Sequence, residues 1–257
     1  MKAVVLGGTT GIGRALAQRL AARGDAVFLM GLDEADLARS ASDLKSRSAG
    51  QTRQTGQTRQ GGGNVGYAVC NLEKPEGFVA ALDAADAALN NFDTVIVTAA
   101  MYATQEALEA DIELTQRLVT VNYANTVVFC EHVRKRLLSR GGGWLTVFSS
   151  VAGDRGRKPV GIYGSSKAGI ARYLEALDHK YHTGGLSVLC VKPGFVKTGM
   201  TAGLKPPPFA GDPDQVADDV LRAMDARKPI LYTPHVWALV MMGIRHLPRF
   251  VMRKISF

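Results

Sequence analysis

Short apolar runs recur along the chain and are separated by longer stretches with helical spacing of apolar residues. The runs are Ala3–Leu6, Ala26–Met30, Val65–Cys70, Thr94–Thr98, Trp144–Phe148, Ser187–Val191 and Ile230–Tyr232. Gly24 is well placed to end the first helix. Strands that alternate with helices predict a parallel sheet covered on both faces, an α/β fold of three layers, α/β/α. Right-handed crossovers make the sheet doubly wound, with a ligand crevice at its switch point.

A glycine-rich turn follows the first strand. Gly7, Gly11 and Gly13 stand between that strand and the start of the next helix. Glycines let the backbone turn sharply and approach a pyrophosphate, and the helix N-terminus offers free N–H groups. The turn therefore predicts a Rossmann-type dinucleotide-binding domain that spans residues 1–257.

Four polar residues follow in an order that indicates catalysis. Tyr163 and Lys167 are four residues apart, so they share one face of a helix. A free phenol titrates near ~10, and a neighbouring cation is expected to move its pKa down toward neutrality. Ser150 follows the strand that ends at Phe148 and opens onto the ligand crevice. Asn122 lies farther back, in a long helical pattern.

With these motifs in this order, the chain resembles the short-chain dehydrogenase/reductase family in its single-domain form, from Lys2 to about Thr233. The family's Gly-x-x-x-Gly-x-Gly turn falls on Gly7, Gly11 and Gly13. The resemblance implies that the catalytic residues are Asn122, Ser150, Tyr163 and Lys167. It also implies that the cofactor contacts Gly7, Thr9, Thr10, Gly11, Ile12, Gly13, Gly31, Leu32, Asn71, Leu72, Ala99, Ala100, Tyr163, Lys167, Pro193, Gly194, Val196 and Thr198.

Three positions depart from the family pattern. Leu6 replaces the usual Thr before the first glycine, and Val97-Thr98-Ala99-Ala100 replaces Asn-Asn-Ala-Gly. Asn71 replaces an Asp, although its amide oxygen can still accept a hydrogen bond. These changes indicate a divergent subgroup with its catalytic residues in place.

The resemblance implies an NAD(P)(H)-dependent oxidoreductase that interconverts a carbonyl and a secondary alcohol by hydride transfer. Ser150 would hold the carbonyl oxygen, and Tyr163 would act as general acid/base. Lys167 would lower the Tyr163 pKa and bind the nicotinamide ribose, and Asn122 would anchor a water. One alternative is a dinucleotide-binding sensor or scaffold with little turnover. Another is an epimerase or dehydratase, which would need a larger C-terminal domain.

Cofactor choice depends on the end of the second strand, where the family carries an acid for NAD or a basic residue for NADP. Gly31 stands at the acidic position and Leu32 where Arg is common. Asp33 lies two residues beyond the acidic site and is better placed to cap the next helix. NADP(H) is therefore favoured over NAD(H) without excluding it. No metal site is expected, since His179 and His182 fit a solvated helix face better than a ligand pair.

The last sixty residues bear on the substrate. Residues 198–211 correspond to the family's substrate lid, and Met200, Leu204 and Phe209 indicate an apolar or amphipathic substrate. Residues 235–257 mix apolar and basic positions without an acid, which suits a helix lying on anionic lipid or one packed at a subunit interface. This tail is similar to that of reductases acting on polyprenyl-phosphate-linked keto-sugars. The resemblance also implies a homodimer or homotetramer built from the helices carrying Asn122 and Tyr163.

Composition adds little to this picture. The net charge of +8 fits anionic lipids, anionic substrates or solubility alone, and no nucleic-acid motif accompanies it. Cys70, Cys130 and Cys190 lack metal or disulfide spacing and are expected as small apolar fillers in a reduced compartment, so we expect the cytoplasm, with possible contact at the inner membrane surface. The polar repeat at 49–63 is expected as a mobile surface loop, although its arginines could approach a cofactor phosphate.

Overall fold

The computed structural model describes residues 1–55 and 64–255, without the side chains of residues 48–55. In this part of the chain the strands are β1 (Lys2–Leu6), β2 (Ala26–Gly31), β3 (Val65–Val69), β4 (Thr94–Val97), β5 (Gly143–Phe148), β6 (Leu186–Pro193) and β7 (Ile230–Thr233). They form one parallel sheet in the order β3-β2-β1-β4-β5-β6-β7. All the predicted strands are present, with ends shifted by one or two residues.

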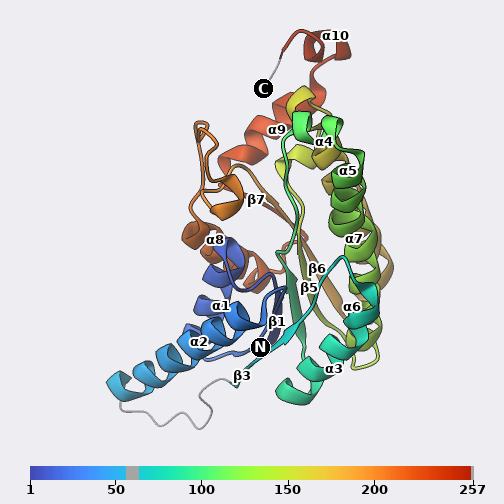
Figure 1. Ribbon diagram of the computed structural model, residues 1–257. Helices are drawn as coiled ribbons and strands as arrows, with labels where there is room; N and C mark the ends of the chain where they lie inside the picture. Colours follow the sequence, from blue (N-terminus) through green and yellow to red (C-terminus); the bar gives the residue numbers. More distant parts are fainter. Residues whose placement is uncertain (56–63, 256–257) are drawn as a thin grey trace.

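Helices cover both faces of the sheet, which confirms the predicted three-layer Rossmann-type fold (Figure 1). One face carries α1 (Gly11–Arg23), α2 (Glu34–Thr55) and α8 (Pro213–Asp225). The other carries α3 (Phe78–Leu89), α6 (Thr126–Leu138) and α7 (Gly161–Tyr181), and α4 (Gln105–Ala110) and α5 (Ile112–Val119) pack against α7. Near the top of Figure 1, α9 (Val236–His246) lies at the carboxyl end of the sheet, and α10 (Arg249–Met252) follows it, farther from the strands.

Short helical turns connect these elements. They are η1 (Pro75–Gly77), the π-helical η2 (Thr120–Asn125), η3 (Val151–Gly153), η4 (Lys158–Val160), η5 (His182–Gly184) and η6 (Gly199–Thr201). As expected, Gly24 ends α1, and its φ of 88° is one that residues with a side chain rarely adopt.

Two apolar cores hold the layers together, one on each face of the sheet. The first includes Phe78 of α3 and Phe129 of α6, whose rings meet edge to face at 5.4 Å between centroids. The second includes Leu16 of α1 and Val220 of α8. Because β1, β2 and β4 are buried on both faces, their sequences are apolar after the first residues Lys2 and Thr94 of β1 and β4 and do not alternate.

The strand order reverses at β1, whose neighbours are β2 on one side and β4 on the other. The connections that follow β1 and β4 lead to opposite faces of the sheet, so a crevice forms between them at the carboxyl ends of these strands. Gly7 follows β1 there, and Thr98 follows β4 and donates its backbone N–H to the Leu6 carbonyl at 2.9 Å. The predicted ligand crevice therefore opens between the glycine turn and the end of β4.

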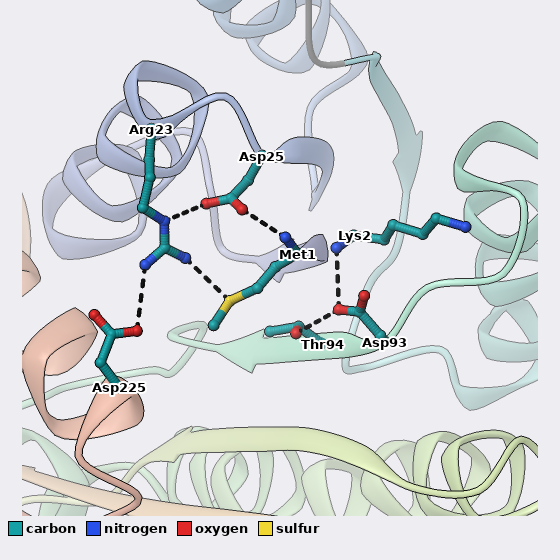
Figure 2. A network of polar contacts seen from close by, with 7 residues as sticks. All are labelled: Met1, Lys2, Arg23, Asp25, Asp93, Thr94 and Asp225. Carbon is teal, nitrogen blue, oxygen red and sulfur yellow. Dashed lines mark hydrogen bonds and ion pairs between the residues drawn. The ribbon is translucent and has the colours of Figure 1, made fainter. Parts of the chain in front are cut away.

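Polar contacts tie together the opposite, amino ends of the strands (Figure 2). The Asp25 carboxylate, just before β2, accepts from the Met1 amino group at 2.5 Å and from Arg23 Nε at 2.6 Å. Asp93, just before β4, accepts from the Lys2 backbone N–H at 3.0 Å. Three adjacent strands are thus fixed at the end of the sheet remote from the crevice.

The predicted loop at 49–63 is wrong in its first half, because α2 continues to Thr55. Ala, Gln and Arg are good helix formers, and a growing helix needs no apolar residue to add a further turn. The remaining part, 56–63, lies outside the described residues. The three cysteines are buried thiols, as predicted, and burial raises the pKa of Cys70 to about 12.

Candidate active site

A cavity of about 650 Å³ lies at the carboxyl ends of the strands. It extends from the glycine turn at the start of α1 to the C-terminal helix α9. Ser150, Tyr163 and Lys167 line it between these ends. The glycine turn and three of the predicted catalytic residues therefore share one space.

The glycine turn forms a cradle that side chains would fill. A Cβ atom on Gly13 would lie 2.1 Å from the Gly7 carbonyl oxygen, and Gly7 itself has a φ of +90°. Gly11, Ile12 and Gly13 open α1 and line the cavity, and Thr10 makes no side-chain cap bond to their N–H groups. This arrangement fits the pyrophosphate of a dinucleotide, which needs close backbone approach and N–H donors.

Lys167 is a buried residue of the cavity wall. It is 3% exposed, and its Nζ donates to the Phe148 carbonyl at 2.9 Å, at the end of β5. Nζ lies 5.8 Å from the centre of the Tyr163 ring. Burial lowers the pKa of the Lys167 ammonium to about 8, because a buried charge loses its hydration.

Tyr163 differs from the sequence prediction in the direction of its pKa shift. Burial raises the pKa of its phenol to about 12, and a hydrogen bond with Ser150 only partly opposes this. Lys167 does not reverse the shift, since its ammonium is directed to the Phe148 carbonyl. Tyr163 is therefore a neutral phenol at physiological pH.

Ser150 combines a structural and a cavity-facing role. Its Oγ accepts from the Ala152 backbone N–H at 3.1 Å and so caps η3. The same hydroxyl donates to the Pro193 carbonyl at 3.4 Å, a long bond that a stronger acceptor would replace. Pro193 ends β6 and Ser150 follows β5, so the contact joins the carboxyl ends of two neighbouring strands.

Comparison with known families agrees with this geometry. The model of a protein family described as "short chain dehydrogenase" matches residues 1–208. The chain belongs to the short-chain dehydrogenase family.

Similar proteins of other organisms match most of the chain. An uncharacterised oxidoreductase of Mycobacterium tuberculosis is 32% identical over 253 residues, 98% of this chain and 95% of its own. The cis-4-hydroxycyclohexanecarboxylate dehydrogenase of Sinomonas cyclohexanicum is 26% identical, over 89% of this chain and 81% of its own. A short-chain dehydrogenase from Sphingobium yanoikuyae, solved with NADPH, has the same fold, with a TM-score of 0.78, 22% identity and coverage of 99% and 96%.

The cavity gathers most of the family's cofactor positions and leaves others outside its walls. Those that line it are Gly7, Thr10, Gly11, Ile12, Gly13, Ala99, Ala100, Tyr163, Lys167, Pro193, Gly194, Val196 and Thr198. Those outside it are Thr9, Gly31, Leu32, Asn71, Leu72 and the catalytic candidate Asn122. All of the latter except Asn122 belong to the end of the crevice where the family is expected to hold the adenosine.

At that end, Gly31 leaves room beside β2, since a Cβ there would meet nothing nearer than Leu37 Cδ2 at 3.5 Å. Leu32 is 69% exposed. Asp33 caps α2 as predicted, its Oδ1 accepting from the Asp36 backbone N–H at 2.8 Å. The Asn71 amide oxygen already accepts from the Glu73 backbone N–H at 2.8 Å. Among these four positions, none presents a free carboxylate at the end of β2.

Asn122 lies in the π-helical turn η2, not in a regular helix. Its Oδ1 accepts from the Met101 N–H at 2.7 Å and its Nδ2 donates to the Met101 carbonyl at 2.8 Å. The side chain therefore fixes the loop after β4, and a role in anchoring water stays a prediction. π-turns of this kind occur often at functional sites.

Sequence reasoning missed several residues of the cavity wall. Tyr102 packs edge to face on Tyr163, with 5.2 Å between ring centroids, and Arg157 also lines the cavity. From α9 come Trp237, Val240 and Ile244. Their spacing of three and four residues is the signal that could have identified a buried helix face. Neither the lipid nor the subunit interpretation of the tail included this contact with its own active site.

Other candidates for chemistry find no support in the described ranges. His179 and His182 are exposed, as expected. Within residues 1–55 and 64–255, no group of three His, Cys, Asp or Glu side chains is arranged to hold a metal ion. The same part of the chain contains no helix with the length and hydropathy needed to cross a bilayer.

Burial of Lys167 predicts a pH-dependent stability. Its pKa is lowered from 10.5 to about 8, so between these values the folded chain binds fewer protons than the unfolded chain. Stability relative to a variant without the amine must then rise with pH in this window. We expect the free energy of unfolding of Lys167→Met, relative to that of the wild type, to be higher at about pH 7 than at about pH 9.5. Urea denaturation at both pH values measures this, and a constant difference would contradict the assigned burial cost.

Proposed function

We propose that the protein interconverts a carbonyl and a secondary alcohol with NAD(P)(H), with Tyr163 as general acid/base. The observation that carries this proposal is the convergence of Ser150, Tyr163 and Lys167 on the cavity that also contains the glycine turn. Each residue alone has a structural explanation, as the capping bond of Ser150 illustrates. The stability of the fold does not require that all three share one cavity with the glycine turn.

The dinucleotide would lie along the cavity floor. Its pyrophosphate would be held by the glycine turn, and Ala99, Ala100 and the segment from Pro193 to Thr198 would border the nicotinamide. Lys167 would reach the nicotinamide ribose, because a flexible ammonium suits vicinal hydroxyls. When bound, the nicotinamide supplies or accepts the hydride.

The chain's own residues would manage the oxygen of the substrate. Ser150 would donate to the carbonyl oxygen and hold it beside Tyr163. As the carbon gains a hydride and the oxygen gains charge, Tyr163 would release its proton to that oxygen, which completes the alcohol. The raised pKa of Tyr163 keeps this proton in place until charge develops. A buried Lys167 would then stabilise the tyrosinate, and Asn122 would position the loop beside it.

The cofactor is NADP(H) in this proposal. Gly31 places no carboxylate where a 2′-phosphate would lie, and Asp33 is engaged as a helix cap. The Sphingobium yanoikuyae structure and an actinorhodin polyketide ketoreductase variant were both solved with NADPH. The latter has a TM-score of 0.77 and 22% identity, over 90% of this chain and 94% of its own.

The substrate is apolar or lipid-linked in this proposal. Met200, Leu204 and Phe209 border the cavity from the predicted lid at 198–211, and α9 closes the same end. Trp237 donates to the Phe209 carbonyl at 3.3 Å, which joins lid and helix. This wall provides apolar contact for a hydrophobic substrate and excludes water from the reacting atoms.

Two surfaces suggest partners for the protein as a whole. Exposed Val119, Tyr123 and Val128 near the Asn122 turn support assembly into a homodimer or homotetramer. Exposed Leu239 and Phe250 stand among the basic residues of the tail and support contact with an anionic membrane surface, at the inner face of the cytoplasmic membrane.

Replacing the proton donor provides the main test. We expect Tyr163→Phe to bind NADPH normally and to lose about 10²–10⁴-fold in kcat, the usual contribution of a general acid. Tyr102→Phe is the matched control, because its ring touches Tyr163, and it should lose less than about tenfold. NADPH oxidation with a panel of ketones measures both. Retained turnover in Tyr163→Phe would refute the assigned donor.

Cofactor preference can be tested at the end of β2. We expect Gly31→Asp to weaken NADPH binding by about tenfold or more and to spare NADH, because the new carboxylate would repel the 2′-phosphate. Gly31→Ala is the control, since a Cβ fits there and adds no charge. Fluorescence titration of the reduced nicotinamide gives both Kd values. If Gly31→Asp weakened the binding of NADPH and NADH equally, the 2′-phosphate would not lie beside residue 31.

The lipid contact is testable without opening the active site. Leu239→Ser combined with Phe250→Ser removes exposed apolar groups of the tail and leaves Trp237, Val240 and Ile244 on the cavity. Binding to phosphatidylglycerol vesicles should fall about tenfold or more, since each buried apolar side chain is worth about 1.5–3 kcal/mol. Val79→Ser, an exposed apolar position on α3, is the control. Unchanged sedimentation of the double variant would dismiss membrane contact through the tail.

A further inference from the structure

The charge of the cavity wall is restricted to two residues. Among the described residues that line the cavity, Lys167 and Arg157 are the ones with formal charge, and no Asp or Glu is present. Lys167 belongs to the catalytic group, directed to the Phe148 carbonyl. Arg157 has no part in the proposed chemistry, yet it adds a second cation to a mainly apolar space.

Arg157 lies on the substrate side of the cavity. It stands in the segment that connects Ser150 to Tyr163, and these two residues line the same cavity. This segment also contacts the C-terminal residues beyond the cavity: Arg155 donates to the Leu247 carbonyl at 2.8 Å. Lys158 donates to the Arg253 carbonyl at 2.8 Å. Arg157 is therefore close to the end formed by α9, away from the amino end of α1.

The neighbours of Arg157 are held by other parts of the fold. The Asp154 carboxylate accepts from Lys192 Nζ at 2.6 Å and from the Tyr232 hydroxyl at 2.7 Å. That carboxylate is 3% exposed, so these two donors fix it under the segment. With Asp154, Arg155 and Lys158 all anchored outside the cavity, the backbone around Arg157 is positioned before any ligand arrives.

Electrostatics favours an anion beside this guanidinium. Burial lowers the pKa of Arg157, and the charge of Asp154 opposes that shift. A ligand anion entering the cavity would gain a charge-assisted hydrogen bond in a partly desolvated place, where such bonds are strongest.

We propose that Arg157 recognises an anionic oxygen group, a carboxylate or a phosphate, on the substrate whose carbonyl meets Tyr163. The planar guanidinium presents paired donors that match either group. The apolar wall contributed by α9 and the lid then contacts the carbon skeleton between the two polar ends. This proposal rests on the proposed carbonyl chemistry and specifies its substrate class: an anionic, otherwise apolar ketone or alcohol.

Three matched ketones test it directly in the wild-type protein. The probes are para-acetylbenzoate, para-acetylphenyl phosphate and methyl para-acetylbenzoate, with NADPH oxidation as the readout. We expect at least one anion to exceed the neutral ester by about tenfold or more in kcat/KM, chiefly through KM, as a hydrogen bond to a charged group requires. Preference for the carboxylate or for the phosphate identifies the group. Equal values, or a preference for the ester, would overturn the proposal.

Variants then assign the preference to Arg157. Arg157→Gln should reduce the ratio of anion to ester toward one, and Arg157→Lys should retain part of it as a point charge. Lys205→Gln is the control, because Lys205 is an exposed basic residue of the lid segment that does not line the cavity; it should keep the full ratio. If Arg157→Gln lowers kcat/KM for acid and ester equally, Arg157 is structural and the proposal fails.

A binding measurement separates this proposal from the proposed reaction. Para-ethylbenzoate has the carboxylate but no carbonyl, so calorimetry with it does not depend on turnover. We expect Arg157→Gln to raise its Kd about tenfold or more, and Arg157→Lys to give an intermediate value. An unchanged Kd, or no binding to the wild type, would contradict anion recognition. Absence of turnover with every ketone would instead count against the carbonyl chemistry.

Discussion

Burial of a phenol and an ammonium in the same apolar cavity is the constraint on which the active site depends. Removing Tyr163 and Lys167 from water opposes the charged form of each, so the phenol pKa rises and the amine pKa falls. Tyr163 is therefore prepared to donate a proton, while Lys167, with a pKa of about 8, still carries its charge near neutral pH. Any anion that develops there must be stabilised by Ser150, by Lys167 or by what the ligand brings.

The fold makes this burial possible by concentrating backbone ends at one edge of the sheet. β1, β4, β5 and β6 all deliver their carboxyl ends to the cavity, and α7 supplies Tyr163 and Lys167 from one side. The opposite edge is closed by ion pairs around Asp25 and by hydrogen bonds to Asp93 (Figure 2). Stabilising and functional polar groups thus occupy opposite ends of the same strands, as is usual in doubly wound sheets.

Much of this arrangement could be predicted from the sequence, because local signals determine it. The strands, the turn at Gly7, the α1 end at Gly24 and the Asp33 cap follow from short-range patterns, and the structure contains each of them. The direction of the Tyr163 shift could not be predicted, since it depends on how many atoms from distant segments exclude water. The four-residue spacing predicted that Lys167 lies near Tyr163, but burial determines that the pKa of Tyr163 is raised.

Contacts between distant segments account for the other differences. No local sequence pattern predicts that α9 and Arg157 line the cavity. The same is true of the two hydrogen bonds between Asn122 and Met101. The α2 extension to Thr55 shows the reverse case, in which a polar repeat predicted loop although its residues favour helix.

Titration of Tyr163 in the ligand-free protein tests the account most directly. Ultraviolet difference spectra between the wild type and Tyr163→Phe isolate this phenol from the other tyrosines as pH rises. The account predicts no ionisation of Tyr163 up to about pH 10, the value for a free phenol. Ionisation with a midpoint near neutral pH would show that Lys167 outweighs burial and would contradict the neutral donor described above.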